Sequence, residues 1–395
     1  MNGPLADVTV LAAEQMHSLP HATQLMALMG ATVIKVEPLE GEAGRTGRPT
    51  LVDRDGRTTG STFLRNNLNK QSIALDLKSV RGRELFLSLA ATVDVVAENF
   101  RPGTTQKLGI AYDDVKAVNA RVIYVSISGF GNRTEQPSPY REWAAYAPIV
   151  EGMAGLYEYA RSGDEPARPA SAGALGDTAP GLYAVIGALA ALHERARTGA
   201  GSYVDISMYD SMIAVADIVH PSSMGVEPHR AVEGIGILHS FRASDGWFTI
   251  EVVREPHFPR FAEAVGHPEW TTDERLRTRA GWSKHLDDII RPGVERWAAA
   301  RTKRQAAADL AAAGVAAGPI NTAADIAADP HVAIRSFVHE FDAGMQVVGN
   351  PIPNAATVAV GRWPTLGEHS EVVLSTRLGL SASELADLRE RKVIA

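Results

Sequence analysis

Residues 8–36 read VTVLAAEQMHSLPHATQLMALMGATVIKV, and this stretch decides the fold. Val8–Leu11 and Val33–Val36 are short runs rich in β-branched residues, which is typical of buried strands. Ala22–Met29 lies between them and carries Leu25, Met26, Leu28 and Met29, as an apolar helix would. A strand, a helix and a second strand in this order predict a βαβ unit with parallel strands.

The same alternation continues through the first half of the chain. Thr178–Arg197 is the best helix, because its apolar residues repeat at helical spacing and Gly199 can end it. The other predicted helices are Arg81–Ala90, Tyr112–Val118 and Tyr209–Val215, and the other predicted strands are Val93–Val96, Val122–Ser126 and Val204–Met208. We therefore expect an α/β fold built on a parallel sheet.

The pattern changes near Val219. Residues 220–236 are rich in Pro, Gly and His and predict a linker or loop. A strand at Trp247–Val253, a helix at His257–Val265 and a longer helix at Glu295–Ala313 then predict a second, smaller domain. The tail from Asp329 mixes short strands and turns and ends in a helix at Ser381–Arg391.

Composition restricts the function. The chain has 395 residues, of which 45% are hydrophobic, and its net charge of −7 argues against a nucleic-acid-binding protein. It contains no cysteine, which excludes disulfides, thiolate nucleophiles and Cys-ligated zinc. The first residues do not form a signal peptide, and no run approaches the roughly 18 apolar residues of a membrane span. We expect a soluble, cytoplasmic protein that binds neither nucleic acid nor membrane.

Asp177 is the most informative single residue, because it directly precedes the predicted helix Thr178–Arg197. One interpretation is a helix N-cap, a position at which Asp is favoured. Pro180 weakens that interpretation, since it has no N–H for the cap to bind. The other interpretation is a functional carboxylate, and the two are compatible because a helix start also suits an anion.

Other chemical signals are weaker. No phosphate-binding loop or G-x-S-x-G nucleophile motif is present. His17 and His21 are four residues apart, but no H-E-x-x-H zinc motif accompanies them. Six scattered basic residues are surface residues by default, yet several could converge at the carboxyl ends of the parallel strands, where such sheets bind ligands. They are Lys35, Arg45, Lys70, Lys78, Arg101 and Lys107.

Several stretches in their order resemble the formyl-CoA transferase family, also called the family III CoA transferases, which includes the carnitine CoA-transferase type. The resemblance covers nearly the whole chain. It is carried by Leu25–Ala31, Val33–Pro38, Asn69–Lys78, Asp94–Gly103, Gly173–Asp177, Gly187–Leu192, Gly318–Asn321, Asp329–His331, Gly349–Ile352 and Leu366–His369.

The resemblance implies an interlocked homodimer, in which two chains pass through each other like linked rings. It also implies a large Rossmann-like domain with a parallel sheet, built from both chain ends, and a smaller α+β domain. On this sequence the first part of the large domain is residues 1–218, followed by a linker at 219–236 and the small domain at 237–320. Residues 321–395 would be the return linker and the part that completes the large domain.

The resemblance further implies that Asp177 is the nucleophile. Its carboxylate would attack an acyl-CoA, giving an anhydride and then an aspartyl-CoA thioester, before CoA passes to an acceptor acid. Amides at the helix start would stabilise the oxyanions. CoA would be a substrate, not a permanent cofactor, and no metal is implied. The matching CoA-binding positions are Met16, His17, Leu75, Asp76, Leu77, Lys78, Asn99, Phe100, Arg101 and Lys107.

Departures from the family pattern leave other functions open. His17 replaces a common Gln, Pro38 lacks a basic side chain that Arg45 could supply, and Gly234 and Gly236 match a glycine-rich substrate loop poorly. Glu151 ends a stretch that often reads Tyr-Asp-x-x-x-Gln in relatives. The leading prediction is a CoA transferase, with succinyl-CoA or another short-chain acyl-CoA as donor. The alternatives are a 2-methylacyl-CoA racemase, whose expected His is missing near Tyr146, and a non-catalytic CoA-binding module.

Overall fold

The structure is a computed structural model that describes residues 3–53, 55–132, 135, 137–161, 165–169, 173–225, 234–340, 345–352 and 359–395. Its chain forms two compact units. The first unit comprises Met1–Asp217 and Ala333–Ala395, and the second comprises Ile218–Val332.

A six-stranded parallel sheet is the centre of the first unit, which confirms the predicted fold class. The strands lie in the order β5-β2-β1-β6-β7-β8, which is the strand order of the Rossmann fold. Their bounds are β1 (Thr9–Ala13), β2 (Thr32–Glu37), β5 (Gln71–Ala74), β6 (Val95–Glu98), β7 (Ile123–Ser128) and β8 (Ser202–Ser207).

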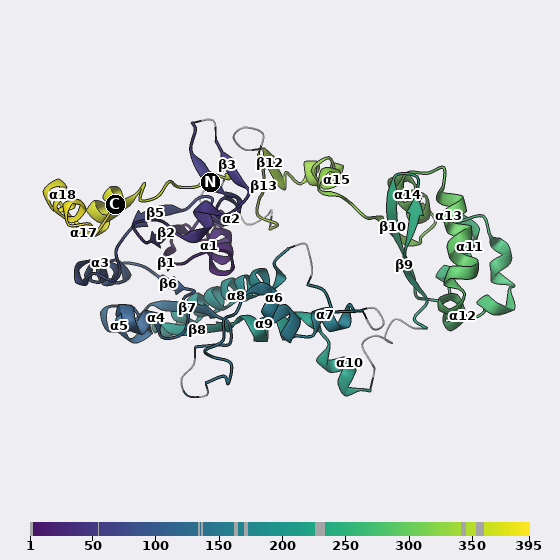
Figure 1. Cartoon of the computed structure of the whole chain (residues 1–395), viewed down its shortest axis with the longest axis horizontal. Coiled ribbons are helices and arrows are strands. Elements are labelled where there is room, and N and C mark those ends of the chain that lie inside the picture. The colour runs from purple at the N-terminus through teal and green to yellow at the C-terminus, as the bar shows by residue number, and fades with distance from the viewer. Residues whose placement is uncertain are drawn as a thin grey trace. The chain divides into compact units, whose positions relative to one another are not determined.

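Alternate residues of each strand face opposite layers of helices, as Val10 and Leu11 of β1 illustrate. Val10 packs with apolar residues of α1 (Ser18–Leu28), α8 (Leu175–Thr198) and α9 (Met208–Ala216). Leu11 packs with α3 (Val80–Ala90), α5 (Tyr112–Val118), α17 (Ser370–Leu378) and α18 (Ala382–Glu390). The C-terminal helices, yellow in Figure 1, thus complete a core begun by the N-terminal strands.

Shorter elements complete the first unit. The helices are α2 (Ser61–Asn66), α4 (Thr104–Leu108), α6 (Ala147–Met153) and α7 (Leu156–Tyr159), and the strand pairs are β3 (Thr50–Val52) with β4 (Thr58–Gly60) and β12 (Val338–Glu340) with β13 (Gln346–Val348).

The second unit has its own core around an antiparallel sheet in the order β11-β10-β9. Its strands are β9 (Ile237–Ala243), β10 (Gly246–Val252) and β11 (Ala316–Pro319), and its helices include α10 (Val219–Ser223), α11 (His257–Ala264), α12 (Arg279–Lys284), α13 (Arg291–Ala298), α14 (Lys303–Ala312) and α15 (Ala323–Ala327). The predicted single helix at Glu295–Ala313 is wrong, because Thr302 caps a new helix with a reciprocal bond to Gln305. The predicted linker includes α10, and its residues 226–233 lie outside the described residues.

Among the described residues, α8 alone has the length and apolar composition of a membrane span. It packs against α1, α9, β7 and β8 and contributes Ala184, Val185 and Ala188 to the core of the first unit. A core helix of a folded domain meets the same test of length and composition, so α8 carries no further conclusion.

Candidate active site

The candidate site lies where the strand order reverses, between β1 and β6. Residues that follow β1 and β6 meet there at the carboxyl edge of the sheet, the place where open α/β sheets bind ligands. The side chain of Asn99 joins the two segments, because it donates to the Gln15 carbonyl and accepts from the Gln15 amide, at 3.0 Å in each case. Asn99 therefore fixes the loop that carries Met16 and His17.

Asp177 lies in a cavity of about 170 Å³ at this edge. Five of the predicted CoA-binding residues share that cavity with it, namely Met16, His17, Asn99, Phe100 and Arg101. The rest of the lining is Gln15, Ser18, Pro102, Ile127, Ser128, Gly129, Arg141, Trp143, Ala145, Tyr146 and Met208.

A second cavity, of about 330 Å³, contains the other predicted CoA-binding residues except Lys107. Leu75, Asp76, Leu77 and Lys78 line it, and Lys107 lines neither cavity. Gln15 and Phe100 line both cavities, so the two adjoin. All predicted CoA-binding residues except Lys107 therefore line two adjoining cavities, from that of Asp177 to that of the exposed Lys78.

Asp177 is not an N-cap residue, so that interpretation is wrong. Helix α8 begins two residues earlier, at Leu175, with Ala174 at the cap position. The start of α8 approaches its neighbours closely: a Cβ on Gly176 would lie 2.6 Å from the Ala147 carbonyl oxygen, and one on Gly181 would lie 2.8 Å from the Ser18 carbonyl oxygen. Glycine at these positions lets α6 and α1 press against the first turns of α8 and hold Asp177 in place.

The carboxyl of Asp177 is unusually hard to ionise. Burial, and to a smaller extent the nearby charge of Glu151, raise its pKa to about 6, while the charge of Arg65 acts in the opposite direction. A carboxyl with a raised pKa in a cavity is typical of a functional site.

Glu151 is the neighbour that the sequence identified only as a departure from the usual Gln. It is 4% exposed, and its Oε1 accepts the Gly176 amide at 2.8 Å. Its Oε2 accepts the hydroxyl of Tyr157. Glu151 thus anchors the first turn of α8 and adds a negative charge beside Asp177.

His17 is neutral at physiological pH. Burial lowers its pKa to about 4, and the charges of Arg65 and His21 act in the same direction. The His17 and His21 rings lie 6.3 Å apart, and among the described residues no group of three His, Asp or Glu could hold a metal. The pair therefore gains no third zinc ligand in the described part of the chain.

Four residues that line the Asp177 cavity each have a buried polar atom without a hydrogen-bond partner in the described part of the chain. These atoms are His17 Nε2, Ser18 Oγ, Ser128 Oγ and Arg141 Nε. An unpaired buried polar group costs about 1–3 kcal/mol, so such groups are usually satisfied. Residues with unpaired polar atoms thus gather at the cavity that Asp177 lines.

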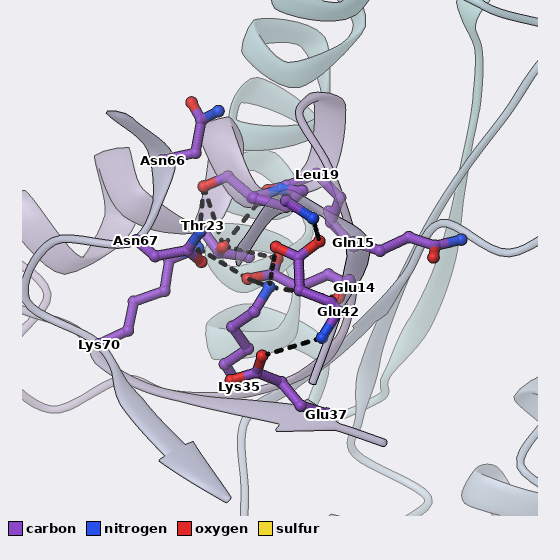
Figure 2. Close-up of polar contacts among 12 residues, drawn as sticks. Glu14, Gln15, Leu19, Thr23, Lys35, Glu37, Glu42, Asn66, Asn67 and Lys70 are labelled. Carbon is purple, nitrogen blue, oxygen red and sulfur yellow. Dashed lines mark hydrogen bonds and ion pairs between the residues drawn. The ribbon is translucent and has the colours of Figure 1, made fainter. Parts of the chain in front are cut away.

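A buried ionic cluster supports the loop after β1, and Figure 2 shows it. Lys70 Nζ lies 2.7 Å from Glu14 Oε1 and also donates to the Pro20 carbonyl and to Asn67 Oδ1. Lys35 Nζ lies 3.6 Å from Glu14 and 3.5 Å from Glu42.

Glu42 in turn accepts the Met16 amide at 3.0 Å and the Gly44 amide at 2.7 Å. Met16 has a positive φ of 64°, an unfavourable conformation for a side chain of this kind. The ionic cluster therefore holds Met16, and with it the start of α1, in the shape that forms the cavity.

Three of the six basic residues that could have converged on a ligand are structural. Lys35 and Lys70 are buried in the ionic cluster, and Arg45 pairs with Glu37 at 2.6 Å while it stacks on Phe63 at 3.9 Å. Arg45 also donates to the Pro364 carbonyl, so its guanidinium is occupied and does not replace a basic side chain at Pro38. Sequence alone could not distinguish buried lysines from surface ones here.

Sequence reasoning also missed Ser128 and Arg141 and the positioning role of Glu98. Ser128 ends β7, and Arg141 lies in the loop that follows, so their places after a parallel strand were the available signal. The buried Glu98 accepts the Phe100 amide at 2.8 Å and the Ser126 hydroxyl at 2.5 Å, which orients Phe100 between the two cavities.

Comparisons with known proteins identify the family of the chain. The chain is 35% identical to the succinyl-CoA–D-citramalate CoA-transferase of Chloroflexus aurantiacus, over 99% of this chain and 98% of that protein. It is 33% identical to the succinyl-CoA:mesaconate CoA-transferase of Haloarcula marismortui, over 94% of this chain and 96% of that protein. It is 30% identical to the formyl-CoA:oxalate CoA-transferase of Streptomyces coelicolor, over 99% of each.

Solved structures give the same result. A CAIB/BAIF family protein from Brucella suis superposes with a TM-score of 0.85 at 32% identity, over 95% of this chain and all of that one. Rv3272 from M. tuberculosis superposes with a TM-score of 0.79 at 28% identity, over 94% of this chain and 99% of that one. The model of CoA-transferase family III matches residues 5–370. The resemblance read from the motifs is confirmed: the chain is an enzyme that belongs to CoA-transferase family III.

Proposed function

We propose that this enzyme transfers CoA from a short-chain acyl-CoA to a free carboxylic acid, with Asp177 as the nucleophile. The observation that carries the proposal is the Asp177 carboxyl itself, half-buried in a cavity whose lining includes four residues that each have an unpaired buried polar atom. Relatives named for succinyl-CoA make succinyl-CoA the first donor to test.

The proposed reaction conserves atoms and charge at each step. A carboxylate oxygen of Asp177 attacks the thioester carbonyl, and CoA thiolate leaves to give an aspartyl–acyl anhydride. The thiolate attacks the aspartyl carbonyl and releases the donor acid as its carboxylate. The acceptor carboxylate then attacks the resulting aspartyl-CoA thioester, which expels the thiolate and leaves a second anhydride. The thiolate attacks the acceptor's carbonyl in this anhydride, which forms the new acyl-CoA and frees the Asp177 carboxylate. Two easier exchanges replace one difficult exchange.

The oxyanions of these steps need hydrogen-bond donors, and three amides of the first turn of α8 are already occupied. The amides of Asp177 and Thr178 donate to the Ala174 carbonyl, and that of Gly176 donates to Glu151. In our proposal the donors are His17 Nε2–H and the hydroxyls of Ser18 and Ser128, all unpaired and in the same cavity.

CoA is proposed to extend from Asp177 into the second cavity. Phe100 and Gln15 line both cavities and would flank the pantetheine arm. Lys78 and Arg101 are exposed cations on this path and would contact its phosphates. Lys107 is also exposed, and it directly precedes Leu108, which lines the second cavity.

A homodimer also remains a proposal. Leu182, Ile186 and Leu189 of α8 are large apolar side chains that are 46%, 61% and 36% exposed in one chain. Covering them with a second copy would remove apolar surface from water. Light scattering of the purified protein tests the proposal, and a monomer at micromolar concentration would contradict it.

Asp177→Ala tests the proposed nucleophile. It should abolish CoA transfer, measured by mass between a panel of acyl-CoA donors and acids, while CoA binding and the melting temperature stay close to wild type. Retention of more than a small fraction of the activity would refute the role of Asp177.

Racemisation is the competing chemistry for the same carboxyl. It needs two groups to remove and return an α-proton on opposite faces. Ala145, Tyr146 and Ala147 supply no His, and Glu151 is occupied by Gly176 and Tyr157. A chiral 2-methylacyl-CoA in deuterated water, without a free acid, should therefore keep its α-hydrogen. Rapid deuterium uptake would favour the racemase.

A further inference from the structure

Arg141 is a cation in the Asp177 cavity to which neither the motifs nor the proposed CoA contacts give a role. It lies in the loop between β7 and α6, at the carboxyl edge of the sheet. Its guanidinium is therefore available to the acyl end of a substrate, because Asp177, which receives the acyl group in the proposed reaction, lines the same cavity.

The loop that carries Arg141 is held by aromatic packing on both sides of it. The rings of Tyr140 and Trp143 lie 4.7 Å apart, and Phe130 lies 5.5 Å from Tyr140 and 6.5 Å from Trp143. Tyr209 closes the group at 5.9 Å from Phe130. Packed rings of this kind stabilise a fixed geometry.

Backbone contacts restrict the same loop. The Arg141 amide donates to the Ser138 carbonyl at 3.1 Å, and the Trp143 amide donates to the Tyr140 carbonyl at 2.8 Å. A Cβ on Gly129 would lie 2.3 Å from the Ala145 side chain, so the loop's far end sits directly on the end of β7. Arg141 is thus presented from a preorganised support, as ligand-binding residues are.

Arg141 is charged and has no ion pair in the described part of the chain, in contrast to two other arginines of the first unit. Arg45 is paired with Glu37, and Arg195 with Asp94 at 2.8 Å. Within the described part of the chain no carboxylate lies in ion-pair distance of Arg141, and its buried Nε has no hydrogen-bond partner. A guanidinium fork of this kind matches a carboxylate, which can accept two parallel hydrogen bonds.

We propose that Arg141 binds the second carboxylate of a dicarboxylic acyl group, and so selects dicarboxylic substrates over monocarboxylic ones. The inference rests on the proposed function. In that reaction the reacting carboxyl carbon of every acid lies at Asp177, and Lys78 and Arg101 contact the CoA phosphates. The charge of Arg141 is therefore left for a second anionic group on the acid. A neutral acyl tail would leave the half-buried Arg141 side chain unpaired.

The test compares two identity exchanges. Succinyl-CoA is incubated with ¹³C-labelled succinate, and butyryl-CoA, which has a methyl group in place of the second carboxylate, with ¹³C-labelled butyrate. Mass spectrometry then follows the label into the thioester. Wild type should exchange the succinyl pair with a kcat/KM about 100-fold or more above that of the butyryl pair, and Arg141→Gln should bring this ratio to within about 10-fold.

Two variants serve as controls. Arg101→Gln should slow both exchanges and preserve the ratio, because CoA is common to both. Arg141→Lys keeps the charge without the fork and should retain an intermediate ratio, which also guards against misfolding of Arg141→Gln.

The outcomes are distinguishable. An unchanged ratio in Arg141→Gln, or an equal loss for both pairs, would overturn the inference and indicate that Arg141 serves CoA or the loop itself. Exchange of both pairs by wild type without a preference would also overturn it, while leaving the proposed function intact. Absence of exchange for both pairs in wild type would instead refute the proposed function together with the inference.

Discussion

Glu151 Oε1 lies 2.8 Å from the backbone nitrogen of Gly176, the residue directly before Asp177. One buried carboxylate thus holds the helix turn that carries another, and its charge opposes the ionisation of its neighbour. In the proposed mechanism only ionised Asp177 attacks, so burial and the charge of Glu151 together raise the pH at which the enzyme becomes active.

Glu151→Gln should move the acidic limb of the pH–rate profile to lower pH. Gln can still accept the Gly176 amide, but it removes the negative charge that contributes to the raised pKa of Asp177, about 6. Part of the shift should remain, because burial is its larger cause. Glu194→Gln, at an exposed position of the same helix, is the matched control and should leave the limb in place. An unmoved limb in Glu151→Gln would contradict the coupling.

Asp177→Asn should stabilise the protein, and the gain should depend on pH. An unperturbed Asp releases its proton near pH 3.8 and folded Asp177 near pH 6, so between these values only the native state holds the proton. Stability of the wild type therefore falls as pH rises through this window. The variant should exceed wild type in free energy of unfolding by about 1–3 kcal/mol above pH 6, and the difference should shrink toward pH 4. Urea titrations across this range measure it, and a gain independent of pH would refute the assignment.

Lys70→Met tests the ionic cluster below the site. It leaves Glu14 buried without its 2.7 Å partner, and loss of one member of a buried pair costs about 3–5 kcal/mol. Arg81→Met breaks the exposed pair with Glu84 and should cost less than about 1 kcal/mol. Chemical denaturation compares the two. Similar costs would mean that the cluster contributes little to the stability of the fold.

Lys78→Gln should weaken the binding of the CoA portion alone. If Lys78 contacts the 3′-phosphate, KM for acyl-CoA should rise about 3–10-fold, and the effect should disappear with the 3′-dephospho thioester. Lys116→Gln, an exposed lysine that lines neither cavity, is the control. An equal rise of KM with both thioesters would place Lys78 elsewhere on the path.

The sequence predicted the parallel sheet well because its strands are buried on both faces and read as apolar runs. Val8–Leu11 and Val33–Val36 were found as β1 and β2 in this way. The strand Gln71–Ala74 was missed, since two of its four residues are polar: Ser72 donates to Glu37 at 2.6 Å inside the protein. The helix break before Lys303 was missed because Ala-rich segments continue the helical pattern on both sides of Thr302.

The candidate site was only partly predictable. Asp177 and the predicted CoA-binding positions came from motifs, and all of these except Lys107 line the two adjoining cavities. Whether a lysine is buried or free depends on contacts distant in the chain, such as that of Lys70 with Glu14, 56 residues away. The same holds for Arg141, whose importance rests on having no partner in the described part of the fold, a property that no local pattern encodes.

Trapping of the intermediate tests the covalent role of Asp177. The enzyme is incubated with succinyl-CoA and no acceptor acid, treated with hydroxylamine or borohydride, digested and mapped by mass spectrometry. We expect CoA to be attached to the enzyme before treatment, and the hydroxamate or the reduced side chain to be found at Asp177 afterwards. Modification at a different residue, or no adduct under conditions in which the enzyme turns over, would contradict the mechanism.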